Sequence, residues 1–288
     1  MPKVSIIVPI FNTEKYLKRC LDCLINQTLR DIEIICIDDG STDNSASILD
    51  EYAQKDTRIK LLKQKNLRQG AARNNGVNIA TGDYIGYVDS DDWVDLDFYE
   101  KLYNTANEYD ADIALATNIR IHPKCSKKRL NIRKTAEYTT LQEKFDICKQ
   151  WKNECPTNKI YRKKMLTKNQ IIWPEGIYCE DKIYTAKAVF YSNKIVTVPN
   201  THYYYFDNPT STVNTKHRGT DKNARHNARR SVIKFLREQN ANLKDKQFWA
   251  LVKEYRIFNI PLWRYKESLY TEAFFLFGKI KLWEKKLK

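Results

Sequence analysis

Short apolar runs alternate with helix-like patterns along the first part of the chain. Val4–Ile10 is almost wholly apolar, as expected of a buried strand, and Leu17, Cys20, Leu21 and Leu24 follow at helical spacing. The alternation then continues through further strand-like runs at Ile32–Ile37, Ile59–Leu62, Tyr84–Val88 and Ile113–Ala116. Strands this apolar, separated by helices, predict an α/β fold with a mostly parallel sheet covered on both faces.

The pattern changes in the last quarter of the chain. After about Gly219 the alternation stops, and helical spacing appears at Ala224, Ala228, Val232 and Phe235 and again at Phe248, Val252 and Tyr255. We therefore expect an α/β domain over residues 1–218 and a helical, basic C-terminal region over residues 219–288.

The end of the chain combines an apolar stripe with lysines. Over Leu269–Lys288 the apolar residues recur at helical spacing and several lysines lie between them. This pattern predicts a basic amphipathic helix, which can attach to an anionic membrane surface. Packing on the α/β domain or on a second copy of the chain is an equal alternative, so a homo-oligomer stays open.

The composition indicates which kinds of partner and which cellular compartment to expect. The formal net charge is +15, which favours anionic partners such as nucleic acid, anionic lipid or sugar nucleotides. The seven cysteines form no disulfide-like pattern, and Cys20 and Cys23 fall inside a helical pattern. No signal peptide is visible, and no apolar run approaches the ~20 residues needed to span a bilayer. We expect a cytoplasmic protein.

Two carboxylates follow the strand-like run Tyr84–Val88. Asp89 and Asp91 lie one residue apart at a predicted strand end, where both can point at one divalent cation. Oxygen ligands select a hard metal, Mg²⁺ or Mn²⁺, which can bridge the phosphates of a nucleotide. Acidic residues are also common in turns and at helix starts, so this motif alone does not establish a metal site.

Other predicted strand ends carry residues that suit a nucleotide. Pro9 and Phe11 end the first strand, where an aromatic ring can pack on a base. Asp39 ends the second strand and can accept a hydrogen bond from a nucleobase or a ribose hydroxyl, whereas Ser41–Asp43 are interpreted as helix caps. Arg73 lies near a predicted helix start and can reach a phosphate or the base.

In this order and spacing, the segments SIIVPIFN, IDDGSTD, GAARNNG and YIGYVDSDDW resemble the nucleotide-binding half of family 2 glycosyltransferases. The resemblance continues in Asn158–Arg162, in Trp173–Asp181, and in Tyr203–Tyr205 followed by Ser211. It implies the GT-A fold, a Rossmann-like, mostly parallel sheet found in nucleotide-diphospho-sugar transferases. The catalytic domain would then be residues 1–218, with its nucleotide-binding half at about 1–116 and its acceptor-side half at about 117–218.

The resemblance also implies a reaction and its residues. An acceptor hydroxyl attacks the anomeric carbon in line, with inversion, and the family's catalytic base falls on Asp181, with Glu180 beside it. A divalent metal, Mn²⁺ or Mg²⁺, falls on Asp91 and Asp89, and no histidine is assigned to it. The residues implied to bind the nucleotide-sugar are Pro9, Phe11, Asp39, Arg73, Asp89, Ser90 and, at the donor or the site rim, Lys159.

The pair Glu180 and Asp181 has two compatible interpretations. An ordinary Asp is a weak base, with a pKa near ~3.9, but the neighbouring Glu180 and partial burial are expected to raise the pKa of Asp181. The same two acids also suit the N-terminus of a helix over Lys182–Tyr191.

The expected substrates are a UDP-hexose or UDP-N-acetylhexosamine donor and a glycan or lipid-linked acceptor in bacterial surface polysaccharide or lipooligosaccharide synthesis. A peripheral position on the inner face of the cytoplasmic membrane would suit such an acceptor. Two alternatives belong to other classes: a nucleotide-sugar-binding scaffold without turnover, and a basic nucleic-acid-binding protein. The presence of both Asp91 and Asp181 argues against the scaffold, and no nucleic-acid-binding module is recognisable, so nucleic acid is not an expected partner.

Overall fold

The computed structural model of the chain describes residues 1–122, 125–150, 155–209, 211, 218–241, 243, 271–276 and 280–286. The chain divides into two compact units, residues 1–228 and 229–288. The predicted boundary, between residues 218 and 219, lies at the start of the helix that contains the structural boundary.

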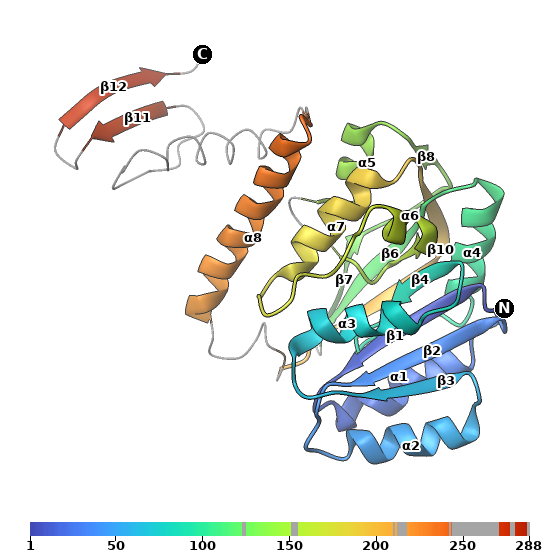
Figure 1. The fold of residues 1–288 in the computed structure, drawn as a ribbon. Helices are drawn as coiled ribbons and strands as arrows, with labels where there is room; N and C mark the ends of the chain where they lie inside the picture. Colours follow the sequence, from blue (N-terminus) through green and yellow to red (C-terminus); the bar gives the residue numbers. More distant parts are fainter. Residues whose placement is uncertain are drawn as a thin grey trace. The chain divides into compact units, whose positions relative to one another are not determined.

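The first unit is built on a central sheet (Figure 1). Its strands are β1 (Val4–Ile10), β2 (Ile32–Asp38), β3 (Ile59–Lys63), β4 (Tyr84–Tyr87), β5 (Trp93–Val94), β6 (Ile113–His122), β7 (Cys125–Leu130), β8 (Glu137–Tyr138), β9 (Lys159–Arg162) and β10 (Ile195–Phe206). The described residues form ten strands in the order β3-β2-β1-β4-β9-β6-β10-β5, with β7 beside β6 and β8 beside β10.

The sheet is mostly parallel along its main path. Strands β3, β2, β1 and β4 pair in parallel, and so do β6 and β10, whereas β9 runs antiparallel between β4 and β6. The predicted strands correspond to β1, β2, β3, β4 and β6, so the predicted α/β architecture is confirmed. In parallel sheets of this kind, ligands bind beyond the carboxyl ends of the strands.

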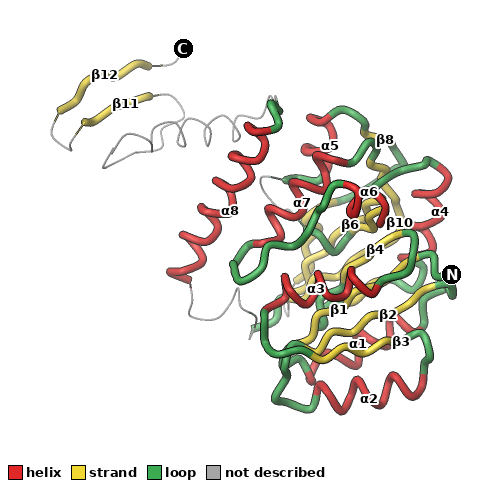
Figure 2. The backbone as a smooth tube through the Cα atoms, in the orientation of Figure 1, coloured by secondary structure: helices red, strands yellow, loops and turns green. Residues whose placement is uncertain are grey.

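Helices cover both faces of the sheet. They are α1 (Glu14–Ile25), α2 (Ser45–Lys55), α3 (Arg68–Ile79), α4 (Phe98–Glu108), α5 (Leu141–Ile147), α6 (Lys163–Lys168) and α7 (Glu180–Tyr191). A further helix, α8 (Arg218–Glu238), contains the boundary between the two units. Successive side chains of a strand point to opposite faces, and Val4, Ile6 and Val8 of β1 join residues of α1, α2 and α4 in the main core. On the other face, α3 lies over β1 and β2 (Figure 2).

Close packing of α3 on the sheet requires a glycine within the helix. A Cβ placed on Gly76 would lie 2.6 Å from Cγ2 of Ile7 and 3.0 Å from Cδ1 of Ile37. A side chain at this position would push α3 away from β1 and β2. This close packing determines where the residues of α3 stand relative to the strand ends.

The C-terminal part differs from the prediction at one place. Helix α8 confirms the helical pattern at Ala224–Phe235, whereas the pattern at Phe248–Tyr255 lies outside the described residues. The predicted amphipathic helix over Leu269–Lys288 is wrong, because β11 (Thr271–Leu276) and β12 (Ile280–Lys286) pair as antiparallel strands. Consecutive aromatic residues favour strands, and the glycine at position 278 of the sequence disfavours a continuous helix.

Two other expectations concern cysteines and membranes. Cys20 and Cys23 both lie in α1, which confirms that they are helix residues, and the seven cysteines of the chain are free. Within the described parts of the chain, no helix is both long enough and apolar enough to cross a membrane.

Candidate active site

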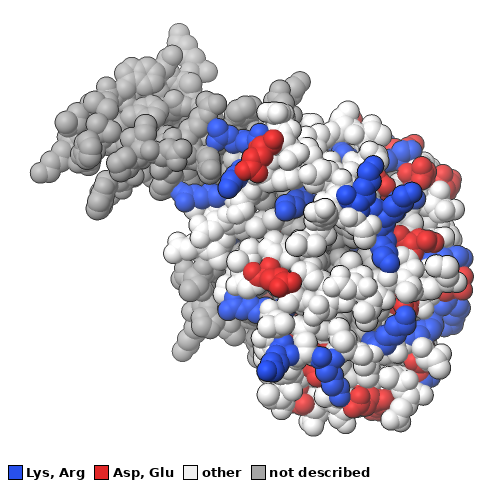
Figure 3. All heavy atoms as spheres, in the orientation of Figure 1, with Lys and Arg blue, Asp and Glu red and all other residues white. Residues whose placement is uncertain are grey.

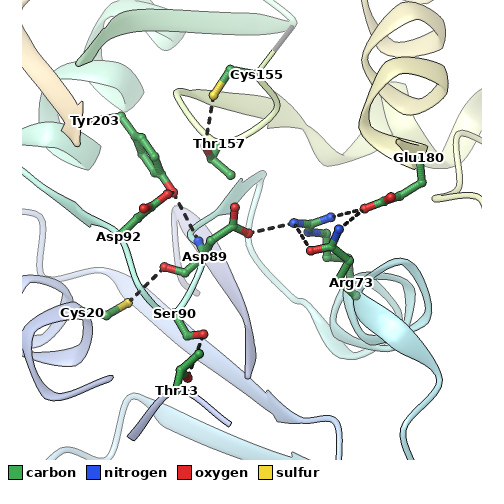
Figure 4. Close-up of polar contacts among 11 residues, drawn as sticks. Thr13, Cys20, Arg73, Asp89, Ser90, Asp92, Cys155, Thr157, Glu180 and Tyr203 are labelled. Carbon is green, nitrogen blue, oxygen red and sulfur yellow. Dashed lines mark hydrogen bonds and ion pairs between the residues drawn. The ribbon is translucent and has the colours of Figure 1, made fainter. Parts of the chain in front are cut away.

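The predicted site residues gather where β1, β2 and β4 end and where α7 begins. Arg73 lies between the end of β4 and the start of α7 (Figure 4). Its Nη2 donates to Oδ1 of Asp89 at 2.7 Å and its Nη1 donates to Oε1 of Glu180 at 3.1 Å. The guanidinium also lies over the ring of Trp173, 4.3 Å from the ring centroid. Arg73 therefore connects the end of β4 with the first turn of α7.

The charge of Arg73 is balanced by these two acids. Its side chain is only 3% exposed, and burial by itself would lower the pKa of Arg73. The carboxylates of Asp89 and Glu180 more than offset this effect and raise the pKa above its usual value. Arg73 is thus a permanent buried cation, with Asp89 on one side and Glu180 on the other.

Asp181 follows Glu180 in the first turn of α7. The backbone N–H of Lys182 donates to Oδ1 of Asp181 at 2.9 Å, and the residue is partly exposed. Burial and the Glu180 carboxylate raise the pKa of Asp181 to about 7, while Arg73 acts in the opposite direction. The predicted upward shift is confirmed. An acid with such a pKa can accept a proton at neutral pH.

Asp89 and Asp91 form the carboxylate pair of the loop after β4. Asp89 uses Oδ1 for Arg73, and Asp91 uses Oδ2 to accept from Nδ2 of Asn208 at 2.9 Å. Burial and the charge of Asp89 raise the pKa of Asp91, so a cation here would relieve the repulsion between them.

The Asp89 and Asp91 pair fits a divalent metal whose remaining ligands come from a substrate. Each acid keeps a second carboxylate oxygen without a side-chain partner among the described residues. Mg²⁺ is commonly held by one or two carboxylates together with substrate phosphates. The described side chains contain no cluster of three or more His, Cys, Asp or Glu that would form a complete protein cage.

Asp92 and Ser90, the other members of the same motif, are turned into the protein. The hydroxyl of Tyr203 donates to Oδ2 of Asp92 at 2.5 Å and the N–H of Phe206 donates to Oδ1 at 2.7 Å. Burial and the charges of Asp91 and Asp89 raise the pKa of Asp92 well above its usual value. Oγ of Ser90 accepts from Oγ1 of Thr13 at 3.0 Å (Figure 4). These contacts hold the loop so that Asp89 and Asp91 remain partly exposed.

The residues predicted around the base lie at the ends of β1 and β2. Pro9 is buried within β1, whereas the ring of Phe11, just beyond it, is 45% exposed. Oδ1 of Asp39 accepts from Nε2 of Gln64 at 2.7 Å and from the N–H of Leu67 at 2.8 Å. Asp39 thus orders the segment between β3 and α3, and its Oδ2 has no partner among the described residues.

Lys159 stands apart from the Arg73 network. It begins β9, is 1% exposed, and its ammonium donates to Oδ1 of Asn158 at 2.8 Å and to the carbonyl of Cys155. No described contact joins it to Asp89, Asp181 or Arg73.

Comparison with known proteins establishes the family. The sequence model of the family "Glycosyl transferase family 2" matches residues 5–169. The chain belongs to glycosyltransferase family 2. The putative glycosyltransferase EpsH of Bacillus subtilis (strain 168) is 32% identical over 71% of this chain and 60% of that protein. The poly(ribitol-phosphate) beta-glucosyltransferase of Bacillus spizizenii is 34% identical over 70% of this chain and 32% of that protein.

A solved structure gives the fold of this family 2 member. S. aureus TarS 1–349 in complex with UDP-GlcNAc superposes with a TM-score of 0.73 at 24% identity, over 89% of this chain and 73% of that one. The predicted GT-A fold is thereby confirmed. The chain spans less than two thirds of the length of the two curated relatives named above.

The site of this family 2 chain also contains residues that sequence reasoning missed. Nε2 of Gln69 donates to Oε1 of Glu180 at 2.5 Å, and Asn208 holds Asp91. Gln69 precedes Arg73 by four residues, so helical spacing could have placed both on one face. Asn208 is 117 residues from Asp91, and no local pattern connects them.

Proposed function

We propose that this chain is an inverting, metal-dependent glycosyltransferase that transfers a sugar from a UDP-sugar to a hydroxyl group. One observation carries the proposal. Arg73 contacts both Asp89, which belongs to the carboxylate pair suited to a metal, and the first turn of α7. That turn contains Asp181, an acid with a pKa of about 7. A transferase needs a charged diphosphate bound on one side of the sugar and a proton acceptor on the other. The arrangement supplies groups for both tasks.

Asp181 acts as the general base in this proposal. Its carboxylate accepts the proton of the acceptor hydroxyl while that oxygen forms a bond to the anomeric carbon. The bond from the anomeric carbon to the diphosphate oxygen breaks, and the nucleoside diphosphate leaves with that electron pair. When bound at Asp91 and Asp89, Mn²⁺ or Mg²⁺ supplies positive charge to the diphosphate. Burial and the charge of Glu180 keep the pKa of Asp181 high enough for proton transfer.

The other predicted residues have parts in donor binding. The exposed ring of Phe11 stacks on the nucleobase above Pro9, and Oδ2 of Asp39 accepts a hydrogen bond from the base or the ribose. Ser90 and Arg73 act mainly by holding Asp89 and Asp91 in place. Lys159, which is buried, contributes indirectly by holding Asn158 and the backbone at Cys155.

The substrates proposed are a UDP-hexose or UDP-N-acetylhexosamine and a glycan or lipid-linked acceptor of a bacterial surface polymer. The UDP-GlcNAc in the TarS complex and the poly(ribitol-phosphate) named for one relative support this choice. An anionic acceptor such as poly(ribitol-phosphate) also suits the net charge of +15 of this chain. The proposed place of action is the cytoplasm, at the inner face of the membrane where lipid-linked acceptors are available.

A basic nucleic-acid-binding function has less support. On the face drawn in Figure 3, Asp and Glu are interspersed with Lys and Arg. A surface that binds a phosphate backbone usually gathers its basic residues on one face or stripe.

A donor panel tests the proposal. UDP-glucose, UDP-galactose, UDP-GlcNAc and UDP-GalNAc are each incubated with the protein and Mn²⁺, Mg²⁺ or EDTA, and the UDP released is measured. We expect release from at least one donor with metal, little with EDTA, and little from the Asp181→Asn variant. Tight binding of the UDP-sugars without release would favour a scaffold instead, and preferential binding of an oligonucleotide at physiological salt would contradict the proposal.

A further inference from the structure

One face of α3 holds the segment that leads to Asp181. Nδ2 of Asn74 donates to the carbonyl of Trp173 at 2.9 Å, and the N–H of Trp173 donates to Oδ1 of Asn74 at 2.8 Å. The carboxamide thus satisfies both main-chain polar groups of one residue, as a neighbouring strand would do. Trp173 is 1% exposed, so these two main-chain groups have little access to water as a replacement.

Three neighbours on the same face of α3 reinforce this contact. A Cβ on Gly70 would lie 2.4 Å from the carbonyl oxygen of Pro174, so α3 and this segment touch backbone to backbone. At the other end of the segment, Gln69 and Arg73 contact Glu180. Helix α3 therefore holds the segment at both of its ends, at Trp173–Pro174 and at Glu180.

The part between these two ends also contacts α3, at exposed positions. Nδ2 of Asn74 donates to Oε1 of Glu175 at 2.8 Å, Nη1 of Arg68 donates to the carbonyl of Gly176 at 3.0 Å, and the Arg68 guanidinium lies 4.7 Å from the ring centroid of Tyr178. Residues 175–178 are exposed, and a Cβ on Gly176 would meet no atom within 4 Å. Gly176 and Cys179 both have left-handed backbone, with φ of 70° and 61°. Left-handed backbone by itself does not hold the first turn of α7 in place, so neighbouring residues must do so.

Trp173 transmits its position directly to α7. Its ring stacks on that of Tyr184, with centroids 3.9 Å apart and an interplanar angle of 6°. Tyr184 lies one turn after Asp181 in α7, and its hydroxyl lies 2.8 Å from that of Tyr87 in β4. A shift of Trp173 would therefore move the helix that carries Asp181.

We propose that Asn74 is a positioning residue for Asp181, acting through the main chain of Trp173 and the Trp173–Tyr184 stack. This inference depends on the proposed function, because Asp181 is a base only if the chain catalyses transfer. Asn74 has no described contact with Asp39, Asp89 or Asp91, so its effect should fall on turnover and spare nucleotide binding.

The matched variants are Asn74→Ala and Asn78→Ala. Both remove an asparagine side chain from α3, but Asn78 is exposed. Misplacement of a catalytic group by about 1 Å can cost ~100-fold in rate. We expect Asn74→Ala to lower kcat for UDP release about 10- to 100-fold, with UDP affinity within about 3-fold of the parent, and Asn78→Ala to match the parent. Gly70→Ala, which displaces Pro174, should behave like Asn74→Ala.

A double variant separates positioning from general damage. In the Asp181→Asn background, Asn74→Ala should cause almost no further loss of turnover, because the group that it positions is already inactive. An additive loss, or UDP affinity that falls in parallel with kcat, would overturn the proposal. The donor used is the one in the panel above with the highest rate.

Hydrogen exchange gives a readout that does not depend on activity. Asn74→Ala should speed amide exchange across residues 173–184, while Asn78→Ala should not. Unchanged exchange in Asn74→Ala overturns the positioning role even if the chain proves to be a transferase. Conversely, faster exchange together with full turnover in Asp181→Asn would show that the proposed base, and not the structural link, is wrong.

Discussion

Arg73 and Glu180 form an almost fully buried ion pair, with 3.1 Å between Nη1 and Oε1 and side chains that are 3% and 4% exposed. The pair joins α3 to the first turn of α7, and Arg73 also holds Asp89. Removing one partner of such a pair leaves the other charge buried and unpaired. The candidate site thus helps to hold α3, α7 and the loop after β4 together.

Substitution of Arg73 should therefore destabilise the protein strongly. We expect Arg73→Met to lower the free energy of unfolding by about 3–5 kcal/mol, because Glu180 and Asp89 lose their counter-charge. Urea unfolding at pH 7 measures this loss. Lys63→Met removes an exposed pair with Asp50, at 3.7 Å, and should change stability little. Equal stability of the two variants would contradict the structural role of Arg73.

Replacing Asp181 should separate chemistry from binding. Asp181→Asn keeps the size of the side chain but removes the proton acceptor, and general-base catalysis contributes ~100- to 10,000-fold. We expect turnover to fall within that range while calorimetric UDP affinity stays within about 3-fold of the parent. Loss of UDP affinity together with turnover would instead assign Asp181 to donor binding.

The pH dependence of turnover should report the pKa of Asp181. Since the base must be deprotonated and its pKa is raised to about 7, kcat should rise with pH up to about 7 and level off above it. Glu180→Gln removes the charge that raises this pKa, so the rising limb should move to lower pH. A limb that stays in place in Glu180→Gln would show that another group controls the rate.

Asp91 should control the metal dependence of donor binding. Asp91→Asn keeps an oxygen for Asn208 but removes the charge of the proposed metal ligand. In the parent, we expect Mn²⁺ to increase UDP affinity, and in Asp91→Asn this increase should fall at least about 10-fold. Calorimetry with and without EDTA makes the comparison, with the exposed Asp50→Asn as control. An undiminished metal effect would place the cation elsewhere.

Stability at acid pH should depend on Glu33, at the opposite end of the sheet. Burial alone would raise the pKa of Glu33, but hydrogen bonds from Lys60, Ser5 and Thr81 lower it to about 2. Because the folded state binds this proton less tightly than the unfolded state, its contribution is present above pH 4.5 and is lost as pH falls towards 2.

The contribution of Glu33 amounts to about 2–3 kcal/mol. Urea unfolding between pH 7 and pH 3 should therefore show that the free energy of unfolding of the parent falls steeply as the pH decreases, which we call the acid limb. In Glu33→Gln the limb should be shallower, with lower stability at pH 7. A variant with the same acid limb would show that other carboxylates dominate.

The sequence alone determined the strands β1, β2, β3, β4 and β6 of the sheet, because strands buried on both faces are mostly apolar, and β1 and β2 have that pattern apart from Ser5, Glu33 and Asp38. Asp89 and Asp91 stand out locally as polar residues that follow such a strand, whereas Asp181 was indicated by the resemblance to family 2 glycosyltransferases. The upward direction of the pKa shift of Asp181 followed from expected burial and from its adjacent neighbour Glu180.

Only the tertiary structure decided what these residues contact. Asp91 and Asp92 are adjacent acids, yet Asp92 is buried by Tyr203 and Phe206, which lie more than a hundred positions away in the sequence, whereas Asp91 stays partly exposed. The partners of Arg73 could not be predicted for the same reason, and the helical spacing over Leu269–Lys288 gave no indication that β11 pairs with β12. Backbone periodicity is a property of neighbouring residues, but ion pairs, burial and strand pairing depend on which distant segments the fold brings into contact.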